Sequence, residues 1–199
     1  MLNLFGMDIS SMDGVISWDI AAARGISFAT IRASWGLDGI DTAHSTNMNG
    51  AFANNIKRIP YHWFVTRKDA RAQAQWFVAH SINGELPRMV DLEDTVYVKG
   101  YAGMGVEVLK FLAEVNRLTG EICLVYTSPS YIRSYLQGYP ELSRYPLVIA
   151  HWDAAAPSCP LPWHQGRWQA HQFTGKASAP YYGITQCHDA ALYTWNGEV

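Results

Sequence analysis

Residues 89–94 read Met89-Val90-Asp91-Leu92-Glu93-Asp94, an apolar run that passes into three carboxylates. If the apolar run is a β-strand, side chains two residues apart face the same side of it. Asp91 and Glu93 then project together, with Cα atoms about 6.6 Å apart at roughly 3.3 Å per residue. Two like charges this close cannot ionise independently. The pattern therefore predicts that one carboxyl group has a raised pKa and keeps its proton near neutral pH.

A proton-donating carboxyl group beside a charged one is the arrangement that cleavage of a glycosidic bond requires. Taken alone, an Asp-x-Glu pattern is more often a solvated acidic turn. The chain also contains 8 Trp, 11 Tyr and 7 Phe, which suit both a packed core and a cleft that stacks sugar rings. Other positions in the sequence distinguish these possibilities.

The overall composition is that of an ordinary globular domain. The chain has 199 residues, of which 49% are hydrophobic and 16% are charged. This is enough to bury one core, and we expect a single domain over residues 1–199. The formal net charge of −2 offers no basic surface to nucleic acid. The sequence also lacks a Gly-rich phosphate-binding loop.

No apolar run approaches the roughly 18 residues of a membrane span, so we expect no membrane insertion. The N-terminus lacks the basic and then apolar layout of a signal peptide, which predicts synthesis in the host cytoplasm without a leader. The cysteines Cys123, Cys159 and Cys187 show no CxxC spacing, and the histidines show no HExxH pattern. We therefore expect no disulfide framework, no metal and no other cofactor.

Apolar segments typical of β-strands recur along the chain, and helical patterns separate the early ones. Strands are expected at residues 4–9, 28–33, 58–64, 87–92, 122–126, 146–152, 168–173 and 183–188. Helical periodicity is present at residues 18–24, 46–56, 69–80, 105–118 and 130–136. This alternation is typical of a parallel barrel or a doubly wound sheet.

The alternation stops late in the chain, because residues 152–168 and 173–183 are short connections rich in Pro, Gly and Ser. Helices scarcely fit there. We therefore predict an α/β fold, a distorted TIM-like barrel with about five βα units followed by three strands with short loops.

Active sites of such barrels gather at the C-terminal ends of the strands. The expected strand ends carry polar and aromatic side chains at nearly every position: Asp8, Ser34, Tyr61, His62, Asp91, Glu93, Tyr126, His151, Trp152, His171, Gln172, His188 and Asp189. Each has an ordinary structural explanation by itself, such as a capping aspartate or a buried histidine. If the barrel closes, Asp8 on the first strand lies beside Asp189 on the last, across the mouth from Asp91 and Glu93. Together they predict a cleft with four carboxylates.

In order and spacing, these residues resemble glycoside hydrolase family 25, the N-acetylmuramidases that include many phage endolysins and bacterial autolysins. The resemblance runs from Gly6 to Asp189. Its motifs are Gly6-Met7-Asp8-Ile9-Ser10, Ile31-Arg32-Ala33-Ser34-Trp35-Gly36, Tyr61-His62-Trp63, Asp91-Leu92-Glu93, Tyr126-Thr127-Ser128, Ile149-Ala150-His151-Trp152 and Gln172-Phe173-Thr174. Trp35 stands where the family commonly has Glu, which puts local substrate contacts in question.

The resemblance implies that Glu93 is the general acid, and that Asp91 raises its pKa and steers the 2-acetamido group of the substrate. Asp8 and Asp189 are implied as flanking catalytic charges. Residues expected to bind substrate are Ser34, Trp35, Tyr61, His62, Tyr126, Trp152 and Gln172. The acetamido oxygen can attack the anomeric carbon itself, and a direct acid and base pair is the alternative, which the sequence leaves open.

The leading interpretation is a peptidoglycan hydrolase that cleaves the β-1,4 bond between N-acetylmuramic acid and N-acetylglucosamine. The second is a chitinase-like hydrolase, although residues 86–90 lack the acidic run that chitinases carry before the catalytic Glu. The third, from a different class, is a catalytically silent barrel that binds cell walls. We further expect a monomer that acts on the bacterial wall, with a phage holin as its export route.

Overall fold

The computed structural model describes residues 4–95 and 103–196. Eight strands form a closed barrel, because the sheet order is β1-β9-β8-β7-β6-β5-β4-β2 and β1 also pairs with β2. The strands are β1 (Leu4–Ile9), β2 (Ile26–Trp35), β4 (Lys57–Trp63), β5 (Met89–Asp91), β6 (Leu124–Thr127), β7 (Leu147–Ala150), β8 (Ala170–Ser178) and β9 (Asp189–Trp195). A short strand, β3 (Gly39–Ile40), pairs with the end of β2. The single domain over residues 1–199 stays a prediction, and residues 1–3, 96–102 and 197–199 lie outside the described part.

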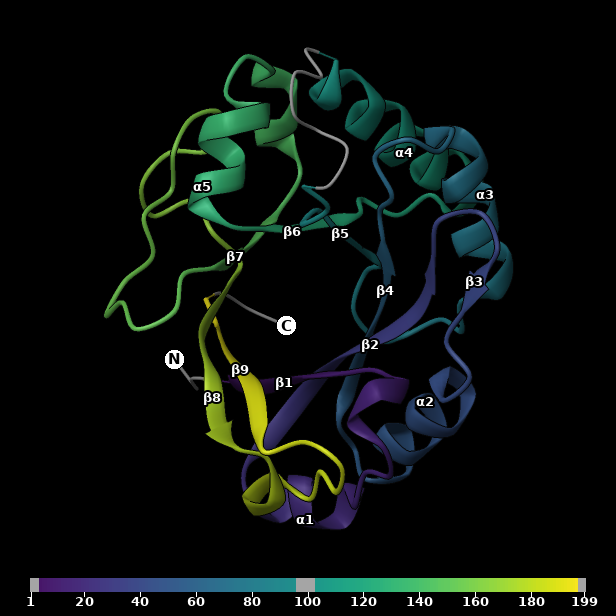
Figure 1. The fold of residues 1–199 in the computed structure, drawn as a ribbon, viewed down its shortest axis with the longest axis vertical. Helices are drawn as coiled ribbons and strands as arrows, with labels where there is room; N and C mark the ends of the chain where they lie inside the picture. The colour runs from purple at the N-terminus through teal and green to yellow at the C-terminus, as the bar shows by residue number, and fades with distance from the viewer. Residues whose placement is uncertain (1–3, 96–102, 197–199) are drawn as a thin grey trace.

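Helices surround the barrel on its outer side (Figure 1). They are α1 (Trp18–Ala23), α2 (His44–Ala53), α3 (Ala70–His80), α4 (Met104–Thr119) and α5 (Pro129–Tyr131), which continues into η2 (Ile132–Leu136). Single turns occur at η1 (Ser11–Asp13), η3 (Pro140–Arg144) and η4 (Ala179–Tyr182). The predicted α/β barrel, with five βα units followed by three strands, is confirmed.

Helix ends follow local sequence signals. The Asp69 side chain accepts a hydrogen bond from the backbone N–H of Ala72 at 2.8 Å and so caps α3. Gly120 ends α4 with a left-handed φ of 76°, which a glycine adopts without strain. None of the helices in residues 4–95 and 103–196 combines the length and the apolar character needed to cross a bilayer.

The last strand does not lie where the sequence predicts it. The expected position was residues 183–188, but Gly183 has a left-handed φ of 83° and ends the η4 turn. The strand instead forms at Asp189–Trp195, where apolar side chains alternate into the core and provide a better strand pattern. It runs antiparallel to both of its neighbours, β1 and β8. Asp189 therefore begins a strand instead of following one.

The two-residue alternation of the strands divides the core into an inner and an outer part. The barrel interior is filled mainly by one cluster that includes Phe28, Ile59, Met89, Leu124, Val148, Tyr193 and Trp195. Gly6 leaves room for this filling, because a Cβ at that position would lie 2.2 Å from the Phe28 ring. The interior is thus filled by apolar and aromatic side chains, and Asp8 and Asp91 lie at the C-terminal ends of β1 and β5.

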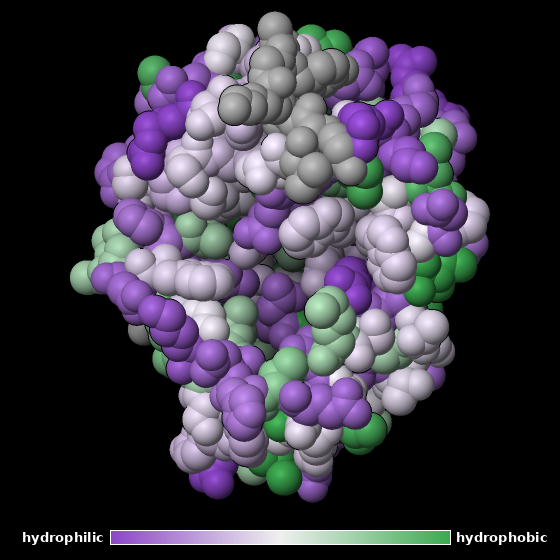
Figure 2. Space-filling view, viewed as in Figure 1, coloured by the Kyte–Doolittle hydropathy of each residue, from purple (hydrophilic) through white to green (hydrophobic). Residues whose placement is uncertain are grey.

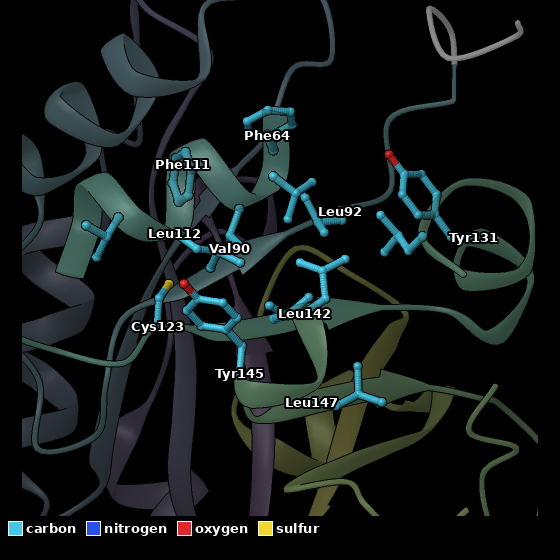
Figure 3. Packing of buried hydrophobic residues seen from close by; sticks show 14 of the residues in the cluster. Phe64, Val90, Leu92, Phe111, Leu112, Cys123, Tyr131, Leu142, Tyr145 and Leu147 are labelled. Atoms are coloured by element: carbon cyan, nitrogen blue, oxygen red, sulfur yellow. The ribbon is translucent and has the colours of Figure 1, made fainter. Parts of the chain in front are cut away.

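The outer core lies between the strands and the helices. Figure 3 shows part of it, in which Val90 and Leu92 belong to one cluster with Phe64 and with Phe111 of α4. Cys123 is buried in the same cluster. Since Val90 and Leu92 face outward, the alternating Asp91 and Glu93 face the barrel mouth. The outward packing of Val90 and Leu92 therefore fixes the direction in which Asp91 and Glu93 point.

Candidate active site

Asp8, at the end of β1, is one of three carboxyl groups that meet at the barrel mouth. Its Oδ1 accepts a hydrogen bond from the Thr30 hydroxyl at 2.8 Å, and its Oδ2 accepts one from the Tyr193 hydroxyl at 3.3 Å. Burial raises the pKa of Asp8 to about 7, with smaller contributions from the charges of Asp13 and Glu93, while the Thr30 hydrogen bond opposes the shift. Asp8 is thus poised to change charge near neutral pH.

Asp91 is buried at the end of β5. Burial, and then the charges of Glu93 and Asp8, raise the pKa of Asp91 well above its usual range, while the Arg32 guanidinium opposes this. Its Oδ1 is buried and has no hydrogen-bond partner among the described residues. A buried acceptor without a partner is costly, so this atom is suited to receive a donor from a bound molecule.

Glu93 follows the strand by two residues and is half-buried. Burial raises the pKa of Glu93, and a hydrogen bond donated by the neighbouring Tyr126 hydroxyl would oppose this shift. The sequence attributes the raised pKa of Glu93 to the charge of Asp91, whereas in the structure burial is the first cause. Because the two groups interact, their protons belong to the pair, and the pair holds a proton to higher pH than an isolated carboxyl group does.

A hydrogen-bonded chain centred on Gln172 connects the walls of the site. The Gln172 Oε1 accepts hydrogen bonds from the Tyr126 hydroxyl at 2.9 Å and from the Trp152 Nε1 at 2.7 Å. Its Nε2 donates to the Tyr193 hydroxyl at 2.9 Å, and Tyr193 in turn contacts Asp8. Gln172 is 1% exposed. Its expected role in binding substrate is therefore indirect, because its amide is already used by neighbouring side chains.

Tyr61 and Trp152 both lie at the barrel mouth, and their role in binding substrate stays a prediction. Tyr61 is buried on the inner face of β4, and burial followed by the charges of Asp8 and Asp91 raises its pKa well above the usual range. Trp152 is 49% exposed and lines a hollow together with Glu93. Both side chains are therefore in reach of a ligand that occupies the barrel mouth.

Two hollows open near the carboxyl groups. One, of about 400 Å³, is lined by Glu93, Ser128, Pro129, Ser130, Arg133, Ala150, His151 and Trp152. The other, of about 530 Å³, is lined by Ser11, Met12, Arg32, Trp35 and Trp63. Figure 2 shows hydrophilic side chains within a hollow near the centre of this face. A polar centre between hollows with aromatic side chains suits a chain of sugars, whose rings stack on indoles.

Arg32 places a fixed positive charge at the mouth. Its Nε lies 2.9 Å from Asp41 Oδ2, and the Asp41 side chain is fully buried. Asp41 also accepts hydrogen bonds from the backbone N–H groups of Ser11 at 2.9 Å and Ala43 at 3.0 Å. The Arg32 guanidinium carbon lies 5.2 Å from the Trp35 ring centroid. This network holds η1, β2 and the loop before α2 together, and so fixes the second hollow.

Ser34 and His62 do not reach the cleft. Both are fully buried, and the Ser34 hydroxyl lies 2.9 Å from His62 Nδ1. The His62 ring packs between Phe77 of α3 and Phe111 of α4, and burial lowers its pKa to about 3. Because adjacent strand residues face opposite sides, Tyr61 in the mouth requires His62 to point toward the helices. Their expected contact with substrate is corrected accordingly.

Asp189 is exposed at the start of β9, where it pairs with Ser178 in an extension of the β8–β9 hairpin. No described contact brings it to Asp8. The carboxylate that does act on Asp8 from this side is Asp13, which accepts hydrogen bonds from the Ser10 backbone and hydroxyl at 2.7 and 3.1 Å. The structure therefore brings together three of the four predicted acids.

Sequence reasoning missed four side chains of the site: Asp13, Thr30, Arg32 and Tyr193. Two of them were recoverable, since Thr30 and Arg32 have the spacing of an inward-facing pair on β2. Tyr193 lies in the strand whose position was predicted wrongly. Asp13 lies in a one-turn helix after β1, where Ser10 and Asp13 form a capping box. That pattern marks a helix start and not a site residue. Among the described residues, no group of three or more His, Cys, Asp or Glu side chains is placed to hold a metal ion.

The titration of Asp8 predicts a pH-dependent stability. Since the pKa of Asp8 is raised from 3.8 to about 7 in the folded state, its contribution to stability is present below about pH 4 and is lost as pH rises through 7. Asp8→Asn cannot ionise, so we expect its melting temperature relative to the wild type to increase between pH 4 and pH 8. Thermal melts at both pH values measure this, with the exposed Asp19→Asn as control. A difference that is the same at both pH values would contradict the assignment.

The sequence matches the family described as Glycosyl hydrolases family 25 over residues 7–181. It is 27% identical over 167 residues to Lysozyme M1 of Streptomyces globisporus, covering 78% of this chain and 57% of that protein. It is 29% identical over 189 residues to an N,O-diacetylmuramidase of Arthroderma benhamiae, covering 89% of this chain and 78% of that one.

The fold is similar to the crystal structure of a bacterial lysozyme from Streptomyces coelicolor. The TM-score is 0.87 at 24% sequence identity, over 98% of this chain and 92% of that one. The family match covers most of the barrel, including β1 with Asp8, β5 with Asp91 and the following Glu93, and β8 with Gln172. This chain belongs to glycosyl hydrolase family 25.

Proposed function

We propose that this protein hydrolyses peptidoglycan by cleaving the β-1,4 bond between N-acetylmuramic acid and N-acetylglucosamine. The observation that carries the proposal is the partly buried group of Asp8, Asp91 and Glu93 at the barrel mouth, in which each carboxyl group has a raised pKa. Such a group can keep a proton for the glycosidic oxygen near neutral pH. Two relatives, named as a lysozyme and a muramidase, support peptidoglycan as the substrate.

In this proposal Glu93 is the general acid. It gives its proton to the glycosidic oxygen as the bond from that oxygen to the anomeric carbon breaks. The carbonyl oxygen of the 2-acetamido group bonds to the anomeric carbon from the other face, which removes the need for a nucleophile from the protein. Water then attacks the same carbon, and the Glu93 carboxylate takes up the proton of that water. The net result is retention of configuration.

Asp91 receives the N–H of the acetamido group. Its buried Oδ1 has no hydrogen-bond partner in the described part of the chain, and an N–H donor from the substrate would supply one. Negative charge at Asp91 also stabilises the positive charge that the acetamido group acquires when its oxygen attacks. Asp8 adds a further charge that is held by Thr30 and Tyr193.

The identity of the bond is tested by the new ends that digestion creates. Purified peptidoglycan is digested, reduced with borohydride and examined by mass spectrometry. We expect new ends that carry muramitol. In the proposed cleavage the anomeric carbon that is attacked belongs to N-acetylmuramic acid, which therefore becomes the new reducing end. New ends that carry glucosaminitol would indicate a glucosaminidase. Free stem peptides with intact glycan would contradict a glycosidase of any kind.

Two further assays, digestion of chitin oligomers and sedimentation with purified walls, separate the two other functions that the sequence suggests. A chitinase-like enzyme shortens chitin oligomers at least as well as peptidoglycan, whereas we expect no chitin product. A silent wall-binding barrel sediments with purified walls and releases no reducing ends. The presence of Glu93 and Asp91 in a partly buried and interacting pair favours the hydrolase over the silent barrel.

The setting in which the enzyme acts also stays a proposal. We propose that it works as a monomer on the bacterial cell wall, after synthesis in the host cytoplasm and passage through a holin pore. Light scattering on the purified protein tests the first part, with 22.3 kDa expected for one chain. Lysis of cells that express the protein with and without a holin tests the export route.

A further inference from the structure

The hydrogen bonds around Gln172 can be assigned a direction, because one of the groups that contacts its amide can only donate. The Trp152 indole nitrogen can only donate, and it lies 2.7 Å from the Gln172 amide. The atom that it contacts must therefore be the carbonyl oxygen, since the opposite orientation of the amide would place N–H against N–H. The Gln172 nitrogen then faces the Tyr193 hydroxyl at 2.9 Å.

This orientation decides what Tyr126 does. The Tyr126 hydroxyl lies 2.9 Å from the same Gln172 oxygen, and two oxygens at that distance need a hydrogen between them. An amide oxygen has none to give, so Tyr126 donates its only proton to Gln172. A hydroxyl that donated its proton to Glu93 would lower the pKa of Glu93. With its proton on Gln172, however, Tyr126 has only an oxygen lone pair to offer the neighbouring Glu93 carboxyl group. It can accept a hydrogen bond from protonated Glu93 and cannot donate one to ionised Glu93.

Tyr193, on the other side of the Gln172 amide, has the opposite role and can donate a proton. Because the Gln172 nitrogen donates to the Tyr193 hydroxyl, the Tyr193 proton is free to point at Asp8 Oδ2, 3.3 Å away. The Thr30 hydroxyl donates to the other oxygen of Asp8 at 2.8 Å. Asp8 is therefore faced by two donors, which favour its ionised form, whereas Glu93 is faced by an acceptor.

We propose that Gln172 is a positioning residue whose amide makes Tyr126 an acceptor toward Glu93 and Tyr193 a donor toward Asp8. One side chain thereby favours a protonated carboxyl group at position 93 and an ionised one at position 8. Environments that push two carboxyl groups toward opposite protonation states separate the acid from the flanking charge. The inference deepens the proposed function, on which it rests in taking Glu93 as the proton donor.

The test measures the pKa of Glu93 directly, through the chemical shift of its δ-carbon in protein labelled with ¹³C-glutamate. The signal is assigned by its loss in Glu93→Gln. The other titratable or charged groups around Glu93 come from five elements. They are Asp8 on β1, Asp91 on β5, Tyr131 on α5, Arg133 and Tyr135 on η2, and His151 after β7. All of them are kept in the variants, so a shift reports the Tyr126 contact.

In Tyr126→Phe we expect the pKa of Glu93 to fall, because its protonated form loses the oxygen that accepts its hydrogen bond. A rise would overturn the inference, since it would mean that Tyr126 had been donating to ionised Glu93. The sign of the shift therefore decides the question. The ring of Phe fills the same space, so the variant does not depend on a change in packing.

In Gln172→Met the Tyr126 proton loses its acceptor and becomes available to ionised Glu93. We expect the pKa of Glu93 to fall by about one unit, as for a hydrogen bond to a charged group. In the double variant with Tyr126→Phe, the Gln172→Met change should produce no further fall. Gln169→Met, which changes a glutamine that bonds to the Asn196 carbonyl at 3.3 Å, is the matched control and should leave Glu93 unchanged.

An unchanged pKa of Glu93 in folded Gln172→Met would overturn the role of Gln172, whatever the lytic activity. Conversely, the expected shifts in a protein that never lyses walls would support the inference while the proposed function fails. In an active enzyme, the alkaline limb of the pH–rate profile should move to lower pH in both single variants. A loss of activity at all pH values with an unmoved limb would indicate a merely structural role.

Discussion

Glu93→Gln is expected to reduce lysis of purified cell walls by about 10²–10⁴-fold, the range that general acid catalysis supplies. Glutamine keeps the size of the side chain and removes the proton that the leaving oxygen needs. The fold should be retained, because Glu93 is half-buried and the described residues place no ion pair on its carboxyl group. Burial raises the pKa of Glu93, so ionisation of the native residue costs stability as pH rises through that pKa, and the variant avoids this cost.

The measurement is the initial rate of turbidity loss, together with a thermal melt of each protein at the same pH. Glu141→Gln, an exposed glutamate in η3, is the control for the chemical change and should behave as the wild type. If Glu93→Gln kept nearly full activity with an unchanged melt, the proton would have to come from another group. Asp8, with a pKa of about 7, would then be the next candidate for the acid.

The sequence was sufficient for the fold because the early strands and helices alternate with clear periodicity. It was insufficient for the last strand, because residues 183–188 end in His188 and are followed by Asp189, like the other expected strand ends, and so favoured a position that is too early. The correct strand, Asp189–Trp195, has the better apolar alternation but runs antiparallel, which a reading based on βα units does not anticipate. The wrong position of this strand also affected the predicted site, because Tyr193 was missed and Asp189 was expected at the mouth.

The site was predicted best where residues two apart carry the chemistry. Asp91 and Glu93 follow that rule, and the outward packing of Val90 and Leu92 explains why. Tyr61 and His62 are adjacent, so only one of them can face the mouth, and a stricter use of alternation would have excluded His62. The role of Gln172 depends on which atoms of Trp152, Tyr126 and Tyr193 lie next to it. That information exists only in three dimensions.

For the pKa values, too, the sequence predicts one part and the structure supplies the other. The sequence places two carboxyl groups close together and so predicts a raised pKa, but it cannot say which group is more deeply buried. In the structure, Asp91 is 5% exposed and Glu93 is half-buried. Burial is the first cause of the shift for both. The wall of the barrel, more than the spacing of the charges, therefore sets the protonation of the pair.

Asp91→Asn is expected to lower lysis by about 10²-fold or more and to change the shape of the pH–rate profile. The acetamido group loses its charged partner, and a preorganised group of this kind is typically worth 10²–10³ in rate. In the proposed mechanism the active form is the pair with one proton, which resides on Glu93 while Asp91 is ionised. This form is lost on the acid side when the pair gains a second proton, and on the alkaline side when it loses its last one.

In Asp91→Asn only Glu93 titrates. Its proton leaves without repulsion from a neighbouring carboxylate, so the alkaline limb should lie at lower pH than in the wild type. The part of the acid limb that reports the ionisation of Asp91 should disappear. The profile is measured from turbidity loss between pH 4 and pH 9, with the exposed Asp153→Asn as control. A profile of unchanged shape and height would mean that Asp91 only supports the fold, and would return the mechanism to a direct acid and base pair that includes Asp8.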